Sequence, residues 1–127
     1  MDFGHIFEIE HVGRITVLNL RRGVEEIQFD KPPADVAIVL DSIRRGRITD
    51  IVVDCHDVDF LRSTALGFFV TLWKRVENHG GRLVFCNVSE KARQILHATK
   101  LDHVWRVFDS RVAAVVELDS QPHRSER

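Results

Sequence analysis

One segment constrains the fold of this chain more than any other. Residues 51–53 (IVV) are strong β-formers, and the acid Asp54 follows them directly. After a short polar loop come the hydroxyl residues Ser63 and Thr64, and then an apolar-periodic run over residues 65–78 that predicts a helix. The hydroxyl pair therefore stands at a predicted helix start, just after a predicted strand.

Position alone leaves two interpretations of this hydroxyl pair. A Ser or Thr oxygen at a helix start can cap backbone N–H groups that have no partner inside the helix. The same place also tolerates an anion, because the free N–H groups and the helix macrodipole both point there, so a hydroxyl could carry a phosphoryl group. Judged by position, the cap is preferred, since serine and threonine are favoured there for structural reasons alone.

The rest of the chain predicts an alternation of strands and helices. Two β-rich runs near the start predict an antiparallel pair, residues 24–31 form either a short strand or a packed loop, and after Pro32 strand and helix alternate. Such alternation argues for parallel strands joined by right-handed crossovers. The predicted fold is α/β, a single domain over residues 1–118 with a mixed sheet and helices packed against it, followed by a disordered polar tail over residues 119–127. The predicted strands are 5–11, 15–20, 48–54, 82–88 and 104–108, and the predicted helices begin near residues 33, 64, 90 and 110.

Composition narrows the function classes. A length of 127 residues suits one domain, and 44% hydrophobic with 29% charged residues predicts a soluble folded chain. The net charge of −1 offers no basic excess for binding nucleic acid. The start of the chain has no signal pattern, no apolar run reaches membrane-spanning length, and the two cysteines have no disulfide spacing. We therefore predict a cytoplasmic protein without direct membrane contact.

Metal or nucleophile chemistry is poorly supported. Asp54, His56 and Asp57 are possible metal ligands, but no second ligand group with recognisable spacing follows them, so they are interpreted as a polar strand end with solvated side chains. The histidines are scattered and are interpreted as ordinary surface residues. Cys55 and His56 would point to opposite faces of a strand, so Cys55, like Cys86, is predicted to be a buried thiol.

Two further motifs have simple structural explanations. Gly80 and Gly81 follow a helix and precede a strand, which predicts a turn and not a phosphate loop. The cluster of Arg44, Arg45 and Arg47 is interpreted as a solvated helix end, although it could contact the acids of a partner. Without a nucleophile–base pair, a phosphate loop or paired carboxylates, the sequence predicts no cofactor and no enzymatic activity; a small enzyme is motivated only by the acids near the two hydroxyls.

Residues 51–54 and 58–67 together resemble the signature of STAS domains, the anti-sigma factor antagonist family. In that family a strand ends in Asp, and an apolar-Asp-Ser-Ser/Thr-Gly-Leu-Gly segment then opens a helix. Four later segments continue the likeness in the family's order: residues 80–84, 87–89, 96–101 and 107–109. The resemblance covers residues 5–118 and implies a mixed sheet with helices mainly on one side.

The resemblance also implies a function, namely partner switching that regulates transcription. In the family, the second hydroxyl of the motif is phosphorylated by a kinase that also serves as an anti-sigma factor, and a phosphatase resets the domain. Thr64 matches that phosphoacceptor, with Ser63 as the alternative. The implied partner-binding residues are Asp57, Asp59, Arg62, Ser63, Thr64, Ala65 and Gly67.

Two residues depart from the family motif. Arg62 stands where the family has an acid, so it could pair with a phosphate at Thr64 or impair recognition by the kinase. Ala65 replaces a glycine, a mild change because alanine suits a helix. An alternative role is that of a STAS scaffold subunit in a sensory complex or a lipid-transport ATPase, which needs no phosphorylation.

Overall fold

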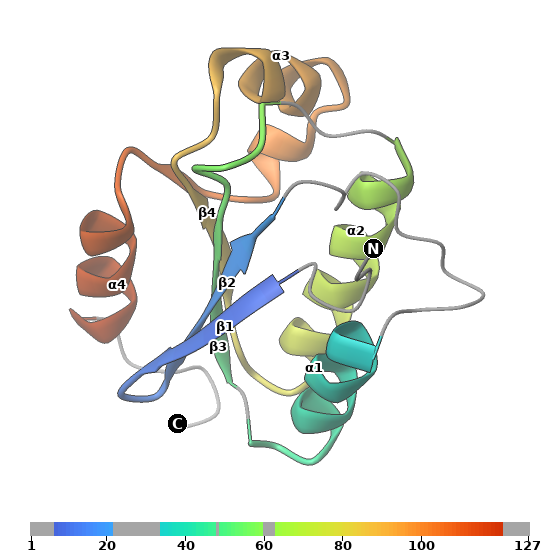
Figure 1. The fold of residues 1–127 in the computed structure, drawn as a ribbon, viewed down its shortest axis with the longest axis vertical. Coiled ribbons are helices and arrows are strands. Elements are labelled where there is room, and N and C mark those ends of the chain that lie inside the picture. Colours follow the sequence, from blue (N-terminus) through green and yellow to red (C-terminus); the bar gives the residue numbers. More distant parts are fainter. Residues whose placement is uncertain (1–6, 22–33, 48, 60–62, 121–127) are drawn as a thin grey trace.

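The computed structural model describes residues 7–21, 34–47, 49–59 and 63–120, and these form one five-stranded sheet with helices on both faces (Figure 1). Helices α1 and α2 lie on one face, α4 lies on the other, and α3 lies beyond one end of the strands. The strands are β1 (Phe7–Val12), β2 (Ile15–Leu20), β3 (Asp50–Asp54), β4 (Leu83–Cys86) and β5 (Val107–Phe108). The helices are α1 (Ala34–Arg44), α2 (Ser63–Asn78), α3 (Glu90–Ala98), the 3-10 helix η2 (Leu101–His103) and α4 (Arg111–Ser120).

The sheet is mixed, as the sequence predicts. Strand β1 pairs antiparallel with β2 through a tight turn in which Gly13 has a φ of +61°. Strands β2 to β5 run parallel in sequence order. Because parallel strands share one direction, their carboxyl ends meet at one edge of the sheet. Asn19, Asp54 and Cys86 lie in a row at that edge. The loop over residues 55–59, which we call the motif loop, begins there.

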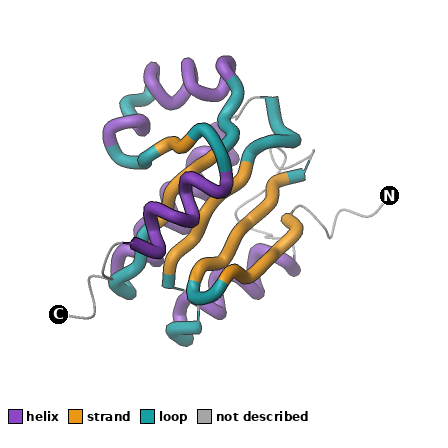
Figure 2. The backbone as a smooth tube through the Cα atoms, turned by 90° about the vertical axis from the view of Figure 1, so that its left-hand side faces the viewer, coloured by secondary structure: helices purple, strands orange, loops and turns teal. Residues whose placement is uncertain are grey.

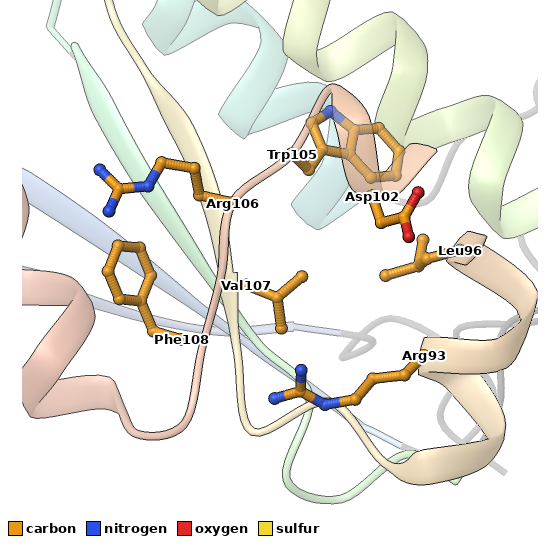
Figure 3. Close-up of a pocket in the computed structure, with 7 residues that line it drawn as sticks. All are labelled: Arg93, Leu96, Asp102, Trp105, Arg106, Val107 and Phe108. Carbon is orange, nitrogen blue, oxygen red and sulfur yellow. The ribbon is translucent and has the colours of Figure 1, made fainter. Parts of the chain in front are cut away.

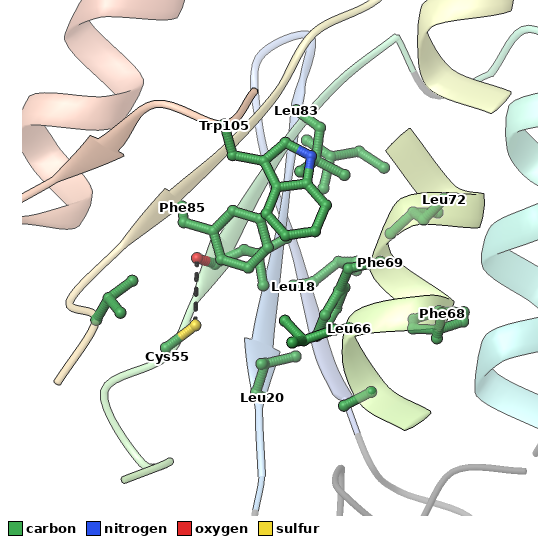
Figure 4. Packing of buried hydrophobic residues seen from close by; sticks show 14 of the residues in the cluster. Leu18, Leu20, Cys55, Leu66, Phe68, Phe69, Leu72, Leu83, Phe85 and Trp105 are labelled. Carbon is green, nitrogen blue, oxygen red and sulfur yellow. Dashed lines mark hydrogen bonds between the residues drawn. The ribbon is translucent and has the colours of Figure 1, made fainter. Parts of the chain in front are cut away.

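The larger part of the core lies between the sheet and helices α1 and α2 (Figure 4). Phe69 of α2 meets Phe85 of β4 edge to face at 5.5 Å, and Phe85 packs on Trp105 at 4.7 Å between ring centroids. Burying such an aromatic side chain stabilises the fold by about 1.5–3 kcal/mol. Helix α2 is thereby anchored to β4 of the sheet.

Helix α4 covers the opposite face of the sheet and packs against β2, β3, β4 and β5 (Figure 2). The second, smaller core cluster lies here and includes Val17, Val52 and Val84 from the strands, with Ala114 and Leu118 from α4. Helices α1, α2 and α3 all contribute to the larger cluster, so the helices do lie mainly on one side of the sheet.

Some predicted boundaries were wrong. Strand β5 begins at Val107 and not at 104, because the η2 turn precedes it and the Trp105 amide donates to the Leu101 carbonyl at 2.9 Å. Helix α4 ends at Ser120, whose hydroxyl donates to the Glu117 carbonyl at 3.0 Å. The possible strand at 24–31 and the rest of the predicted tail, 121–127, lie outside the described residues.

Candidate functional site

The candidate site consists of the carboxyl ends of β3 and β4, the loop over residues 55–59 and the start of α2. Helix α2 begins at Ser63, so the hydroxyl pair opens the helix as predicted. The first turn of α2 contains no acid, so no negatively charged side chain of that turn compensates the positive end of the macrodipole. The side chains of Ser63 and Thr64 and the whole of Arg62 lie outside the described residues.

Asp54 is the centre of the site and not the solvated strand end that the sequence suggested. It is only 2% exposed, and its Oδ1 accepts hydrogen bonds from the His56 amide at 3.1 Å and from Asn87 Nδ2 at 3.1 Å. Asn87 follows β4 directly and has a left-handed backbone with a φ of 55°. The prediction for Asp54 was wrong because Asn87, directly after β4, donates to its carboxylate. The available signal in the sequence was Asn87 itself, a polar residue that directly follows a buried strand.

His56 joins two carboxylates, a role that the sequence did not predict. Its Nδ1 lies 3.0 Å from Asp54 Oδ1, and its Nε2 lies 3.3 Å from Asp57 Oδ2. The hydrogen bond with Asp54 raises the pKa of His56, and the negative charges of Asp54 and Asp57 act in the same direction. A ring that is half exposed therefore links the buried end of β3 to the outer surface of the loop.

The motif loop is also held by Ser89, at the start of α3. The Ser89 hydroxyl donates to the backbone carbonyl of Asp59 and accepts from the Ala92 amide at 3.1 Å, which caps α3. Val58 is 6% exposed and packs into the core, whereas Asp57 and Asp59 are exposed. The loop therefore has a fixed backbone and an acidic outer surface.

We expect Ser89→Ala to lower the free energy of unfolding by about 1 kcal/mol, because a helix loses its N-cap. Urea unfolding followed by circular dichroism measures this loss. Ser120→Ala is the matched control, since its hydroxyl bonds only at an exposed helix end. Equal midpoints for the two variants would contradict the capping role.

The implied partner-binding residues divide into three groups. Asp57 and Asp59 are exposed, as contact with a partner requires. Ala65 is fully buried, because the first turn of α2 already packs into the core, so its side chain faces the core and not a partner. Gly67 is half-buried, and its carbonyl accepts from the Thr71 hydroxyl at 3.1 Å.

A polar pocket of about 290 Å³ adjoins the loop. Arg111 at the start of α4 forms a two-pronged ion pair with Glu10 of β1 and lowers the pKa of that carboxyl. Asn19 is 7% exposed and donates to Glu10 Oε1 at 3.0 Å. The pocket is lined by Glu8, Glu10, Asn19, Leu20, Arg21, His56, Asp57 and Arg111. Within the described ranges, no three His, Cys, Asp or Glu side chains gather into a possible metal site.

A second pocket, of about 330 Å³, lies between α3 and β5, away from the motif (Figure 3). Leu96 and Val107 face each other across it, whereas Arg106 and Phe108 lie on the other side of the strand. Its arginines are already paired, Arg93 with Asp109 and Arg106 with Glu117. This pocket contains none of the residues that the motif singled out.

The remaining predictions concern cysteines, arginines and membrane contact. Cys55 and Cys86 are buried free thiols, as predicted, on opposite faces of the sheet, and burial raises the pKa of Cys86 to about 12. Arg44 and Arg45 form exposed ion pairs with Asp41, in line with a solvated helix end. No helix in the described part of the chain has the length and apolarity needed to cross a membrane.

The fold and the motif together define the class of protein. The model of the STAS domain family matches residues 7–114, and the chain belongs to this family. Among curated proteins, it is 24% identical over 113 residues to the anti-sigma F factor antagonist of Paenibacillus polymyxa, a match that covers 88% of this chain and 93% of the relative.

Solved structures agree on the fold. The anti-sigma factor antagonist SpoIIAA in its unphosphorylated form matches with a TM-score of 0.72 and 20% identity, covering 92% of this chain and 99% of the other. The phosphorylated form of SpoIIAA from Bacillus matches with a TM-score of 0.66 and 22% identity, covering 87% of this chain and 97% of the other.

Proposed function

We propose that this chain is an anti-sigma factor antagonist that acts by phosphorylation-controlled binding to an anti-sigma factor kinase, and that Thr64 is the phosphoacceptor. The observation that carries the proposal is the place of the hydroxyl pair within a STAS fold. Helix α2 begins at Ser63, the exposed acids Asp57 and Asp59 precede it in the chain, and no acid occupies its first turn. Membership of the family and the role named for the Paenibacillus relative support the same reading.

Helix-terminus electrostatics explain how such a switch would work. A phosphoryl group adds about −1.5 to −2 charges at neutral pH, and a helix start without its own acid can accept an anion with little rearrangement. The exposed acids Asp57 and Asp59 lie on the loop that leads into this helix. A partner packed over this surface would have to bury a dianion beside two carboxylates, so binding is lost while both proteins stay folded.

In this proposal the unmodified domain binds the kinase and thereby frees a sigma factor, phosphorylation releases the domain, and a phosphatase restores it. The partner-facing residues are Asp57, Asp59, Arg62, Ser63 and Thr64, with the Gly67 backbone behind them. Arg62 is next to the hydroxyl pair in sequence and would pair with the phosphate, which favours the modified state. The domain works in the cytoplasm through protein contacts and performs no catalysis of its own.

A phosphorylation assay tests the proposal directly. The chain is used to capture its partner from a lysate of the source organism, and the captured kinase is purified and incubated with the chain and ATP. We expect a mass increase of one phosphoryl group, mapped to Thr64, and no increase in Thr64→Ala. Thr71→Ala is the matched control, because Thr71 lies in the same helix with its hydroxyl bonded to the Gly67 carbonyl at 3.1 Å.

Other outcomes are equally informative. A phosphate on Ser63 would keep the switch and move the acceptor by one residue. A kinase that binds the chain without phosphorylating it would contradict the switch. Capture of a transporter ATPase or a sensory complex and no kinase would favour a scaffold role instead.

A further inference from the structure

We propose that His56 is a proton-dependent positioning residue, which holds the motif loop by bridging the buried carboxylate of Asp54 to the exposed carboxylate of Asp57. When His56 loses its proton, Asp57 is released. The effect on partner binding rests on the proposed function, whereas the bridge itself depends only on this chain.

The geometry of the bridge favours a protonated ring, with a hydrogen bond at Nδ1 and an ion pair at Nε2. Nδ1 lies 3.0 Å from Asp54 Oδ1 and Nε2 lies 3.3 Å from Asp57 Oδ2. An ionised carboxylate only accepts hydrogen bonds, a neutral imidazole has one N–H, and an imidazolium has two. Asp54 Oδ1 also accepts from the His56 amide and from Asn87 Nδ2. The bridge is therefore complete only when His56 is protonated.

The two ends of the bridge are not equivalent. The Asp54 side chain is 3% exposed and held by further donors, whereas the Asp57 side chain is 59% exposed. A neutral ring keeps its single N–H on Asp54, because the buried carboxylate loses more when a donor is removed. Deprotonation therefore frees Asp57 and leaves the end of β3 unchanged.

Charged groups from several elements face this bridge. The polar pocket beside the bridge is lined by Glu8 and Glu10 of β1, by Arg21 after β2 and by Arg111 of α4. On β4, Cys86 lies next to Asp54. Arg111 opposes protonation of His56, but it is paired with Glu10, so its effect is partly compensated. With the Asp54 hydrogen bond as the largest influence, the pKa of His56 is raised, which places its titration above the ordinary value of about 6.5.

The direction of the pH dependence follows from this raised pKa. The stabilisation from the bridge is fully present below about pH 6.5 and is lost as the pH rises through the higher pKa of the folded protein. A change in pH across this window alters the fraction of chains with a fixed Asp57.

An NMR titration of the full chain from about pH 5.5 to about pH 8.5 tests the bridge. His56→Gln identifies the imidazole signal of His56, and His79→Gln is the control at the other end of α2. We expect His56 to titrate above about 6.5, the amides of Asp57 and Asp59 to shift with the same midpoint, and Asp57→Asn to lower that midpoint. Asp57 is a surface residue, so this variant should fold even if Asp54→Asn does not. A midpoint at or below the ordinary value, or one unchanged in Asp57→Asn, overturns the inference.

A binding measurement tests the functional consequence. The affinity of the chain for the captured kinase is measured at about pH 6 and about pH 8 by calorimetry. We expect binding to be about two- to fivefold weaker at the higher pH, which is the contribution expected from one exposed ion pair. In His56→Gln we expect no such change. Equal affinities in the wild type, or a pH dependence that survives in His56→Gln, contradict the link to binding. If no kinase binds at either pH, the proposed function fails, and the titration still decides whether the bridge exists.

Discussion

Gly81→Ala is expected to lower the free energy of unfolding by about 3 kcal/mol or more, because there is no space for a methyl group at this position. A Cβ on Gly81 would overlap the carbonyl oxygen of Thr49 and lie 2.7 Å from its carbonyl carbon and 2.8 Å from Val76 Cγ1. The amide of Gly81 also donates to the Val76 carbonyl at 2.9 Å. A backbone shift cannot easily remove this overlap, because residue 49 leads into β3 and residue 81 leads into its neighbour β4.

Gly46→Ala is the matched control for this steric effect. Gly46 has a φ of +73°, yet no atom lies within 4 Å of the Cβ position, so only the conformational cost of about 1–2 kcal/mol is expected. Urea unfolding of both variants separates the two contributions. Similar losses would show that conformation and not close approach makes Gly81 necessary.

Asp50→Ala is expected to lower the free energy of unfolding by about 3 kcal/mol, because it removes one partner of a buried ion pair. Asp50 is 5% exposed and accepts from the Arg82 amide at 2.9 Å and from Arg82 Nη2 at 3.0 Å. The same guanidinium donates to the Leu118 carbonyl at 2.9 Å, so the pair joins β3, β4 and α4. Chemical denaturation gives the loss, and near-ultraviolet circular dichroism shows whether the packing around α4 changes.

Asp41→Ala is the control that compares an exposed ion pair with the buried one. Asp41 pairs with Arg44 at 2.6 Å and Arg45 at 2.9 Å on the exposed side of α1, and exposed pairs contribute at most about 1 kcal/mol. If Asp50→Ala is no more destabilising than Asp41→Ala, the ion pair at the start of β3 does not hold the sheet to α4.

Local patterns were sufficient to predict most of the architecture. The β-rich run before Asp54 and the apolar period of residues 65–78 each depend on side chains a few positions apart, and both elements formed where expected. The turn at Gly80 and Gly81 was predicted for the same reason, and Gly80 has a positive φ of 80°. The short β5 was mislocated because a 3-10 turn precedes it and delays its start.

The chemistry around Asp54 could not be predicted in this way. Its carboxylate meets Asn87, 33 positions later in the chain, and the two are brought together only by the parallel pairing of β3 with β4. The burial of Ala65 was likewise not predictable, because packing in the first turn of α2 depends on the sheet beneath it.

By itself, the sequence determined the order of strands and helices, the family and the place of the hydroxyl pair at the start of α2, because short-range periodicity and capping chemistry specify these features. The tertiary structure alone decided that Asp54 is buried, that His56 bridges it to Asp57, and that Gly81 must lack a side chain. The burial of Asp54 and the lack of space at Gly81 depend on atoms that only the folded sheet places within contact distance. The His56 bridge lies within four consecutive residues, and it depends on the path that the chain takes as it leaves β3.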